Sequence, residues 1–245
     1  MADQFANDSV ADSSSDPALP PDRSPTEQDE PQGPGCLPGV LAATLLMGVV
    51  CFILFAVSAW LIFQKRGDLA SRTLRGTVIP ELEQSRLGPE EKRLVIDQLT
   101  TLAADLEAGR YENWQAGGIM QRLINSPMMR WGDLLAVAAW AEANLPEPER
   151  AEASKQISRF FRAAELDRAV ARDLHDILAP VATGESTTGF VQLRSDLTVE
   201  AVAEVVKRSR LVADRAAVPD QNFPAVSLAE VVRRQIEIGG RDGAT

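Results

Sequence analysis

The chain has 245 residues, with 25 basic and 35 acidic side chains, and its formal net charge is −10. A single histidine and two cysteines exclude sites that need several histidines or four cysteines from one chain, such as a Cys₄ zinc site. The acidic balance argues against general nucleic-acid binding, and the length allows one sizeable hydrophobic core.

Residues 1–36 are acidic and rich in proline and serine. Residues 1–35 hold eight acidic residues against one arginine, a net charge of −7, together with six prolines. Large apolar residues are few, so the segment cannot bury enough surface to offset the entropy lost on ordering. We therefore expect residues 1–36 to be disordered.

Residues 40–63 form an uncharged run of 24 residues, dominated by Val, Leu, Ile, Phe and Ala. As a helix this run would be about 36 Å long, enough to cross a bilayer core of about 30 Å. A buried soluble helix would not be apolar on every face, and a cleaved signal peptide would need a short basic region before it instead of a long acidic one. We predict a permanent transmembrane helix over 37–64, in contact with the lipid bilayer through 40–63.

Basic residues flank this run unevenly. Lys65, Arg66, Arg72 and Arg75 follow it closely, whereas Arg23 alone precedes it. The positive-inside rule therefore predicts a single-pass protein with its N-terminus outside and its C-terminal domain in the cytoplasm. The 21 arginines against four lysines are typical of a genome rich in G and C, which favours a bacterial cytoplasmic membrane.

Small residues and cysteines near the run bear on its partners. Gly35, Gly39 and Ala43 have the spacing of closely paired membrane helices, but small residues are ordinary in such helices and we favour that interpretation. Cys36 could be acylated at the membrane edge or could bridge two chains. Cys51, in mid-span, is expected to be an apolar filler. A protein partner and a homo-oligomer are both kept as candidate interactions.

After Arg75 the sequence predicts an all-α domain of about seven helices. Prolines fall between apolar segments, and long stretches lack glycine, as suits helices. We place a juxtamembrane segment at 65–88, the helical domain at 89–238 and a flexible C-terminus at 239–245. The strand-like segment Phe190–Leu193 is too short to build a sheet.

The first two helices of the domain are predicted from caps and apolar spacing. Gly88 and Pro89 suit a helix start. The apolar residues that follow recur on one helical face: Val95, Leu99, Leu102 and Leu106. The next apolar segment, around Ile119, is interrupted by Gly117–Gly118. We expect this glycine pair to permit the close approach of a neighbouring helix backbone, not to form a cofactor loop.

Five further helices are predicted. Their starting points lie near Asp133, Pro148, Asp167, Thr198 and Ser227. The helices that start near residues 148 and 167 could be one long bent helix. The segment Ser227-Leu228-Ala229-Glu230 has the pattern of a capping box, in which the Ser and Glu side chains bond to backbone N–H groups, and Val226 can pack against Val231.

Sequence motifs for catalysis are nearly missing. His175 lies between Asp173 and Asp176, where a general base is conceivable, but no Ser or Cys nucleophile motif accompanies it and we favour a solvent-facing histidine. Gly184–Gly189 has the glycine spacing of a phosphate loop, but Phe190 replaces the essential lysine. We predict no catalytic, cofactor-binding or metal-binding residue.

The patterns of charged and aromatic residues are explained by the predicted fold and do not require a binding site. Acids alternate with arginines over Glu147–Arg172, which is typical of a solvated helix face. The basic clusters have acids nearby, so we predict no nucleic-acid partner. In an aromatic-poor helical domain we expect tryptophans in the core and not around a pocket: Trp114, Trp131 and Trp140.

Three segments stand out in the order Gly35-Cys36-Leu37, Trp131-Gly132-Asp133-Leu134 and Val226-Ser227-Leu228-Ala229-Glu230. In this arrangement the chain resembles single-pass bacterial membrane proteins with an uncharacterised C-terminal helical domain. The resemblance covers the span and most of the C-terminal part. It implies a membrane anchor and a helical domain, and no activity.

Two function classes remain. The first, which we favour, is a membrane-anchored helical interaction or scaffold module that is not an enzyme. The alternative is a membrane-anchored enzyme with a site around His175 and scattered carboxylates. An enzyme should have a deep pocket in which ionisable groups of shifted pKa converge, whereas a scaffold should have an exposed apolar patch or groove.

Overall fold

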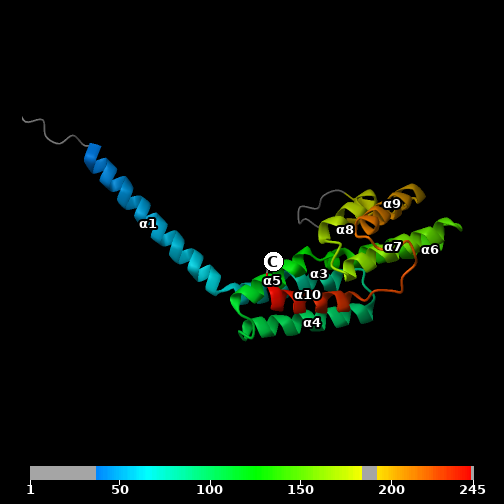
Figure 1. The fold of residues 1–245 in the computed structure, drawn as a ribbon, viewed down its shortest axis with the longest axis horizontal. Coiled ribbons are helices and arrows are strands. Elements are labelled where there is room, and N and C mark those ends of the chain that lie inside the picture. Colours follow the sequence, from blue (N-terminus) through cyan, green and yellow to red (C-terminus); the bar gives the residue numbers. More distant parts are fainter. Residues whose placement is uncertain (1–36, 184–191, 244–245) are drawn as a thin grey trace, which may run out of the picture. The chain divides into compact units, whose positions relative to one another are not determined.

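The computed structural model describes residues 37–183 and 192–243 (Figure 1). The fold is all-α with one helix that could span a membrane, as predicted, and a single two-residue strand pair accompanies the helices of the described part. The expected disordered tail at 1–36 and the glycine loop at 184–190 lie outside the described residues.

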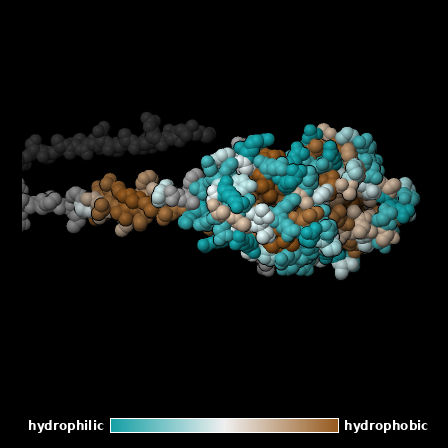
Figure 2. All heavy atoms as spheres, turned by 90° about the horizontal axis from the view of Figure 1, so that it is seen from below, coloured by the Kyte–Doolittle hydropathy of each residue, from teal (hydrophilic) through white to brown (hydrophobic). Residues whose placement is uncertain are grey.

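Helix α1 (Leu37–Gln64) contains the predicted span. Within the described part of the chain, Gly39–Leu61 is the one stretch long and apolar enough to cross a membrane. Its side chains are exposed, and Figure 2 shows an apolar surface on this helix, in contrast to the mostly hydrophilic surface of the helical domain. Thr44 Oγ1 donates to the Val40 carbonyl at 2.7 Å, so its hydroxyl is satisfied within the helix.

The helical domain begins earlier than predicted. Residues 65–88, expected as a juxtamembrane segment outside the domain, fold into α2 (Arg66–Thr73), a π turn (η1, Leu74–Val78) and α3 (Ile79–Gln84). The side chains of this segment that join the hydrophobic core are Ala70, Leu74, Val78, Leu82 and Leu87. The boundary at residue 89 is therefore too late.

The π turn accounts for the failure to predict residues 65–88 as part of the helical domain. Pro80 has no N–H group, so it cannot bond to the Gly76 carbonyl as an ordinary helical residue would. A widened turn before the proline lets the chain stay helical without that bond. Gly76 and Pro80 look like helix breakers in the sequence, whereas buried Leu74 and Leu82 hold both flanks in place.

Segment α2–α3 packs with α4 (Pro89–Glu107), α5 (Asn113–Asn125) and α10 (Leu228–Asp242) as one group of helices (Figure 1). The predicted apolar face of α4 is buried. Helix α10 continues through Asp242, so residues 239–242, which were expected to be flexible, are helical.

Helices α5 and α10 approach each other to backbone contact. A Cβ atom added at Gly239 would lie 2.6 Å from Ile119 Cα, and one added at Gly118 would lie 2.3 Å from the Gly243 carbonyl carbon. Both distances are too short for any side chain. The predicted close approach at Gly117–Gly118 is thus confirmed, and it falls on Gly118.

The N-terminus of α10 is capped differently from the prediction. Ser227 makes no side-chain cap bond, and Glu230 pairs instead with Arg233. The carboxylate of Glu91 in α4 reaches across and accepts from the Ala229 backbone N–H at 2.8 Å and from Ser227 Oγ at 2.9 Å. The Glu91 carboxylate thus supplies the negative charge and the hydrogen-bond acceptor that stabilise the N-terminus of α10. It takes the place of the local capping box, which does not form.

The second group of helices comprises η2 (Pro127–Arg130), α6 (Trp131–Asn144), α7 (Glu149–Glu165), α8 (Ala171–Leu178) and α9 (Val199–Arg215). Thr198 caps α9 by accepting from the Ala201 N–H at 3.2 Å.

Helices α7 and α8 are separate, so the alternative of one long bent helix is wrong. Asp167 has a φ of 61° after α7. The Arg168 N–H donates to the Ala163 carbonyl at 2.8 Å, which closes the end of the helix.

A short ladder and a shared core complete the domain. After η3 (Ala179–Val181), strand β1 (Ala182–Thr183) pairs antiparallel with β2 (Gln192–Leu193). The two groups of helices bury one common hydrophobic cluster.

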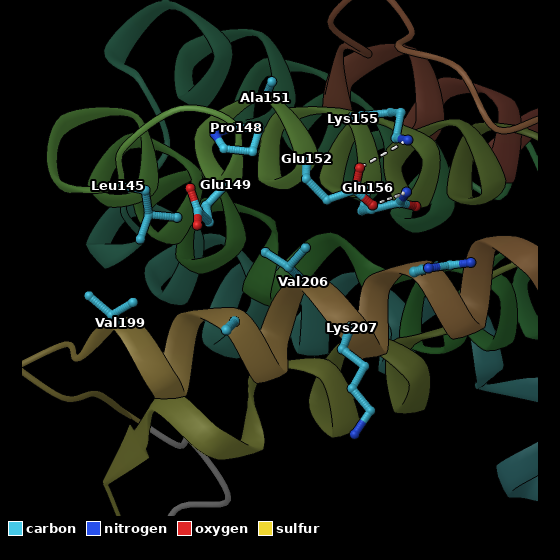
Figure 3. A pocket seen from close by; sticks show the side chains of 12 residues that line it. Leu145, Pro148, Glu149, Ala151, Glu152, Lys155, Gln156, Val199, Val206 and Lys207 are labelled. Carbon is cyan, nitrogen blue, oxygen red and sulfur yellow. Dashed lines mark hydrogen bonds and ion pairs between the residues drawn. The ribbon is translucent and has the colours of Figure 1, made fainter.

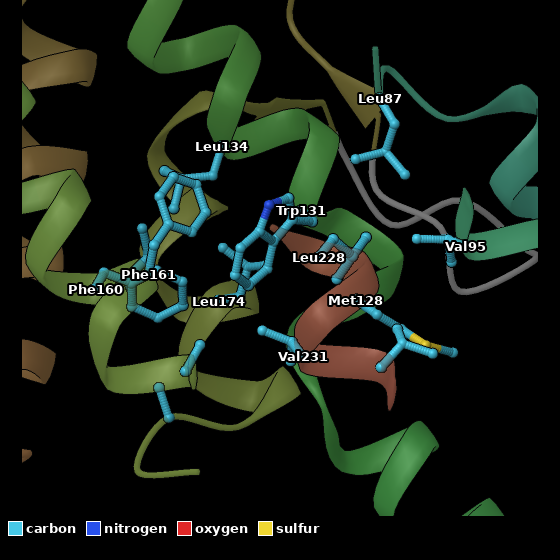
Figure 4. Close-up of a cluster of buried hydrophobic side chains, with 14 of the residues drawn as sticks. Leu87, Val95, Met128, Trp131, Leu134, Phe160, Phe161, Leu174, Leu228 and Val231 are labelled. Carbon is cyan, nitrogen blue, oxygen red and sulfur yellow. The ribbon is translucent and has the colours of Figure 1, made fainter. Parts of the chain in front are cut away.

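Aromatic residues occupy part of this cluster. Trp131 and Phe161 pack with ring centroids 4.4 Å apart, and Phe160 lies next to them (Figure 4). The prediction of core tryptophans is confirmed for Trp131 and is wrong for Trp114, which is 44% exposed and donates to Glu112.

Candidate binding groove between α7 and α9

A groove of about 720 Å³ lies between α7 and α9 (Figure 3). Its apolar lining consists of Leu145, Pro148, Ala151, Val199, Ala203 and Val206. The polar and charged lining consists of Glu149, Glu152, Lys155, Gln156, Lys207 and Arg210. The groove thus has a mixed lining of apolar and charged side chains.

The two helices leave this space because of the residues that face each other. They run parallel, and Figure 3 shows Val206 of α9 pointing toward α7. Ala151 and Ala203 are small and do not fill the gap. Val202 and Val205 of α9 are buried in the core, so Val199 and Val206 are left on the adjoining, more exposed face. Val199 is 48% exposed.

Toward the C-terminal ends of α7 and α9, the side chain of Arg159 fills the space between the two helices. Its side chain is only 2% exposed. Nε donates to the Pro219 carbonyl at 2.9 Å, and Nη2 donates to Asp214 Oδ1 at 2.6 Å and to the Val218 carbonyl at 2.5 Å. Nη1 donates to Gln156 Oε1 at 2.6 Å and lies 3.4 Å from Asp220 Oδ1. A buried cation whose donors are all used can bind the segment after α9 firmly to α7.

Two ionisable groups of the groove, Glu152 and Lys155, stabilise each other in their charged forms. A hydrogen bond from Lys155 lowers the pKa of Glu152, and the same bond raises the pKa of Lys155. The pKa of neighbouring Asp220 is lowered, first by a hydrogen bond from Gln156 and then by one from Lys155. These shifts move each pKa away from neutrality. A proton-transfer catalyst needs the opposite, so these three groups are suited to ion pairing rather than to proton transfer.

The residues of the alternative enzyme site do not come together. His175 is exposed on α8, as predicted, and lines a different hollow in which no carboxylate of the described chain takes part. Asp173 is turned to the backbone N–H of Val170 at 3.0 Å and to Arg215 at 2.7 Å. Among the described residues no group of three His, Cys, Asp or Glu side chains could hold a metal ion.

Sequence reasoning missed the groove although a signal was present. Val199 and Val206 lie outside the buried stripe of α9, and an apolar face wider than the core requires is the mark of a helix with a second contact. The facing wall offered no such signal, because Ala151 is ordinary in any helix.

No protein-family model, curated protein or solved structure matches this chain. The two segments of the noted resemblance that lie wholly in the described part have structural roles. Around Trp131, a Cβ at Gly132 would lie 2.7 Å from the Leu87 backbone nitrogen, so the 86–87 backbone packs directly on α6. Around Ser227, the segment receives the Glu91 carboxylate. Both segments therefore contribute to packing within the domain.

Proposed function

We propose that the chain is a single-pass protein of a bacterial cytoplasmic membrane whose helical domain, on the cytoplasmic side, is an interaction module without catalytic activity. The orientation rests on the basic residues after the span, Lys65, Arg66, Arg72 and Arg75. The interaction role rests on the α7–α9 groove, which is lined by apolar and charged side chains and in which Glu152 pairs with Lys155.

The occupant we propose is an amphipathic helix of another protein. From Val199 to Arg210 the α9 wall is about 16 Å long, which matches three turns of a helix. Apolar side chains of the partner at helical spacing would contact Ala151, Ala203 and Val206. Among the described residues Glu149 on the α7 side has no ion-pair partner, whereas Lys207 on the α9 side is paired with Glu204. A partner with a basic residue facing Glu149 therefore fits best.

Site-specific photo-crosslinking in native membranes tests this proposal. A photo-reactive amino acid replaces Ala203 in the full chain, and the matched control carries it at Leu211 on the same helix, which is 59% exposed but outside the groove. We expect a discrete adduct with another protein from position 203 and none from position 211. An adduct with a second copy of the chain would replace the proposed partner by a homo-oligomer. Equal labelling from both positions would contradict a role for the groove.

A further inference from the structure

A second hollow, separate from the groove, lies between η2 and α8. It has a volume of about 380 Å³, and its apolar lining includes Pro127, Met129 and Leu174. Its charged and hydrogen-bonding residues are Ser126, Arg130, Arg172 and His175. Two arginines and an imidazole meet there with no carboxylate among the described lining residues, which is the composition of an anion site.

Arg130 is left incompletely paired. Its side chain is 14% exposed, and Nε donates to Asp133 Oδ2 at 3.2 Å. Both Nη1 and Nη2 are buried and have no hydrogen-bond partner in the described structure. Leaving a buried donor unpaired costs about 1–3 kcal/mol, and more when the group is charged. Such a guanidinium edge is suited to a bidentate oxyanion, because its two Nη atoms match two oxygens.

The surrounding charges add to this preference. Asp133 is shared, since Arg86 Nη1 also binds it at 2.9 Å, so one carboxylate serves two arginines. Arg172 on α8 has no ion-pair partner among the described residues, and its side chain is exposed at the rim together with His175. Ser126 does not add a donor, because its hydroxyl is used by the Leu123 carbonyl at 2.7 Å.

We propose that this hollow binds a phosphate group, either free or carried by a small soluble ester. Arg86, Arg130 and Asp133 leave one uncompensated positive charge, and Arg172 adds a second. A phosphate monoester carries a charge of about −1.5 to −2 at neutral pH, whereas a simple carboxylate carries only one. The apolar side of the hollow, at Met129 and Leu174, can accept the organic part of an ester.

Calorimetric titration of the full chain with inorganic phosphate, in phosphatidylcholine nanodiscs at constant ionic strength, tests the site. We expect saturable binding by the native chain and affinities at least about tenfold weaker for Arg130→Gln and for Arg172→Gln, since each removes a charged donor. Arg110→Gln is the matched control, because Arg110 is exposed and pairs with Asp105 elsewhere. Arg172 is exposed too, so its variant decides the matter if Arg130→Gln does not fold.

The absence of saturable phosphate binding at millimolar concentration would overturn the proposal, and so would unchanged affinity in Arg172→Gln. A second series of nanodiscs contains phosphatidate and distinguishes a lipid headgroup from a soluble ligand. If inorganic phosphate binds equally well in both series, the soluble ligand is supported. If phosphatidate abolishes phosphate binding, the hollow belongs to a lipid headgroup and the assignment to a soluble ester is wrong.

Discussion

Two pairs of helices in the domain meet in opposite ways. Helices α5 and α10 cross where Gly118 and Gly239 remove the side chains, and the backbones touch. Helices α7 and α9 are joined through Arg159 in their C-terminal halves and leave a groove of about 720 Å³ between their N-terminal halves. In the first pair the backbones are in direct contact at these glycines, so no space is left there for another molecule. In the second, apolar side chains such as Val206 remain available to another molecule.

Helices α5 and α10 belong to the group that also contains α2, α3 and α4. The comparison implies that this group needs all of its helices for full stability. A fragment of residues 65–245 should fold cooperatively, whereas residues 76–245 should be less stable by about 3–5 kcal/mol, because removing α2 uncovers core surface of α4 and α5. Urea unfolding followed by tryptophan fluorescence measures the difference. Equal stability of the two fragments would show that α2 is dispensable and that the domain begins later.

Arg159 is the residue that distinguishes the joined half of α7–α9 from the open half. Arg159→Ala should lower the free energy of unfolding by about 2–4 kcal/mol, because it leaves the Val218 and Pro219 carbonyls without donors. Arg162→Ala on the same helix removes only a surface pair with Glu165 and should cost about 0.5 kcal/mol. Similar losses in both variants, measured by urea unfolding of the full chain in detergent, would contradict the role of Arg159.

The glycine crossing can be tested with neighbouring residues of α10. Gly239→Ala should destabilise the chain by about 1–3 kcal/mol, since the new Cβ would meet the Ile119 backbone. At Gly240 the nearest atom is Tyr111 Cε1 at 3.5 Å, an ordinary contact, so Gly240→Ala should be neutral or stabilising by up to about 1 kcal/mol. Thermal unfolding of the two variants beside the native chain gives the sign of each change in stability. Two effects of the same sign would argue against backbone contact.

The smallest effect concerns pH and the groove. Because the pKa of Glu152 is lowered in the folded state, its contribution to stability is complete above its ordinary pKa of 4.5 and is lost as the pH falls through the folded value. Glu152→Gln should therefore flatten the loss of stability on acidification below this pH. Lys155→Met should flatten it in the same way, and the double variant should add nothing further. Additive effects would show that the two groups act independently.

Most of the architecture could be predicted from sequence where signals are local. The uncharged run at 40–63 marks the span by length alone, and Val95, Leu99 and Leu106 mark α4 by spacing. Gly117–Gly118 indicated a close helix contact. Its partner, Gly239, could not be inferred, because it lies in a distant helix and only the tertiary fold brings the two together.

Features that depend on contacts between residues far apart in the sequence were not predicted or were predicted wrongly. Ser227 and Glu230 form a capping pattern, yet Glu91 from α4 caps α10, and no local signal announces it. The π turn that keeps residues 74–78 helical is visible only once Leu74 and Leu82 are seen in the core. The α7 wall of the groove and the unpaired Arg130 likewise result from how helices meet, which side-chain periodicity does not encode; only the α9 wall had a signal in the sequence, at Val199 and Val206.

The claim that the α7–α9 groove binds a partner is tested most directly by a pair of charge substitutions on α9. Val206→Glu places a carboxylate in the groove, and Leu211→Glu places one on the exposed side of the same helix. Val206 is half-buried and packs against the core, so Val206→Glu should lower the free energy of unfolding by about 1–3 kcal/mol, whereas Leu211→Glu should change it by about 0.5 kcal/mol or less. With the photo-reactive residue at position 203, the partner adduct should be lost in Val206→Glu and retained in Leu211→Glu. An adduct of undiminished yield in a folded Val206→Glu chain would contradict the account.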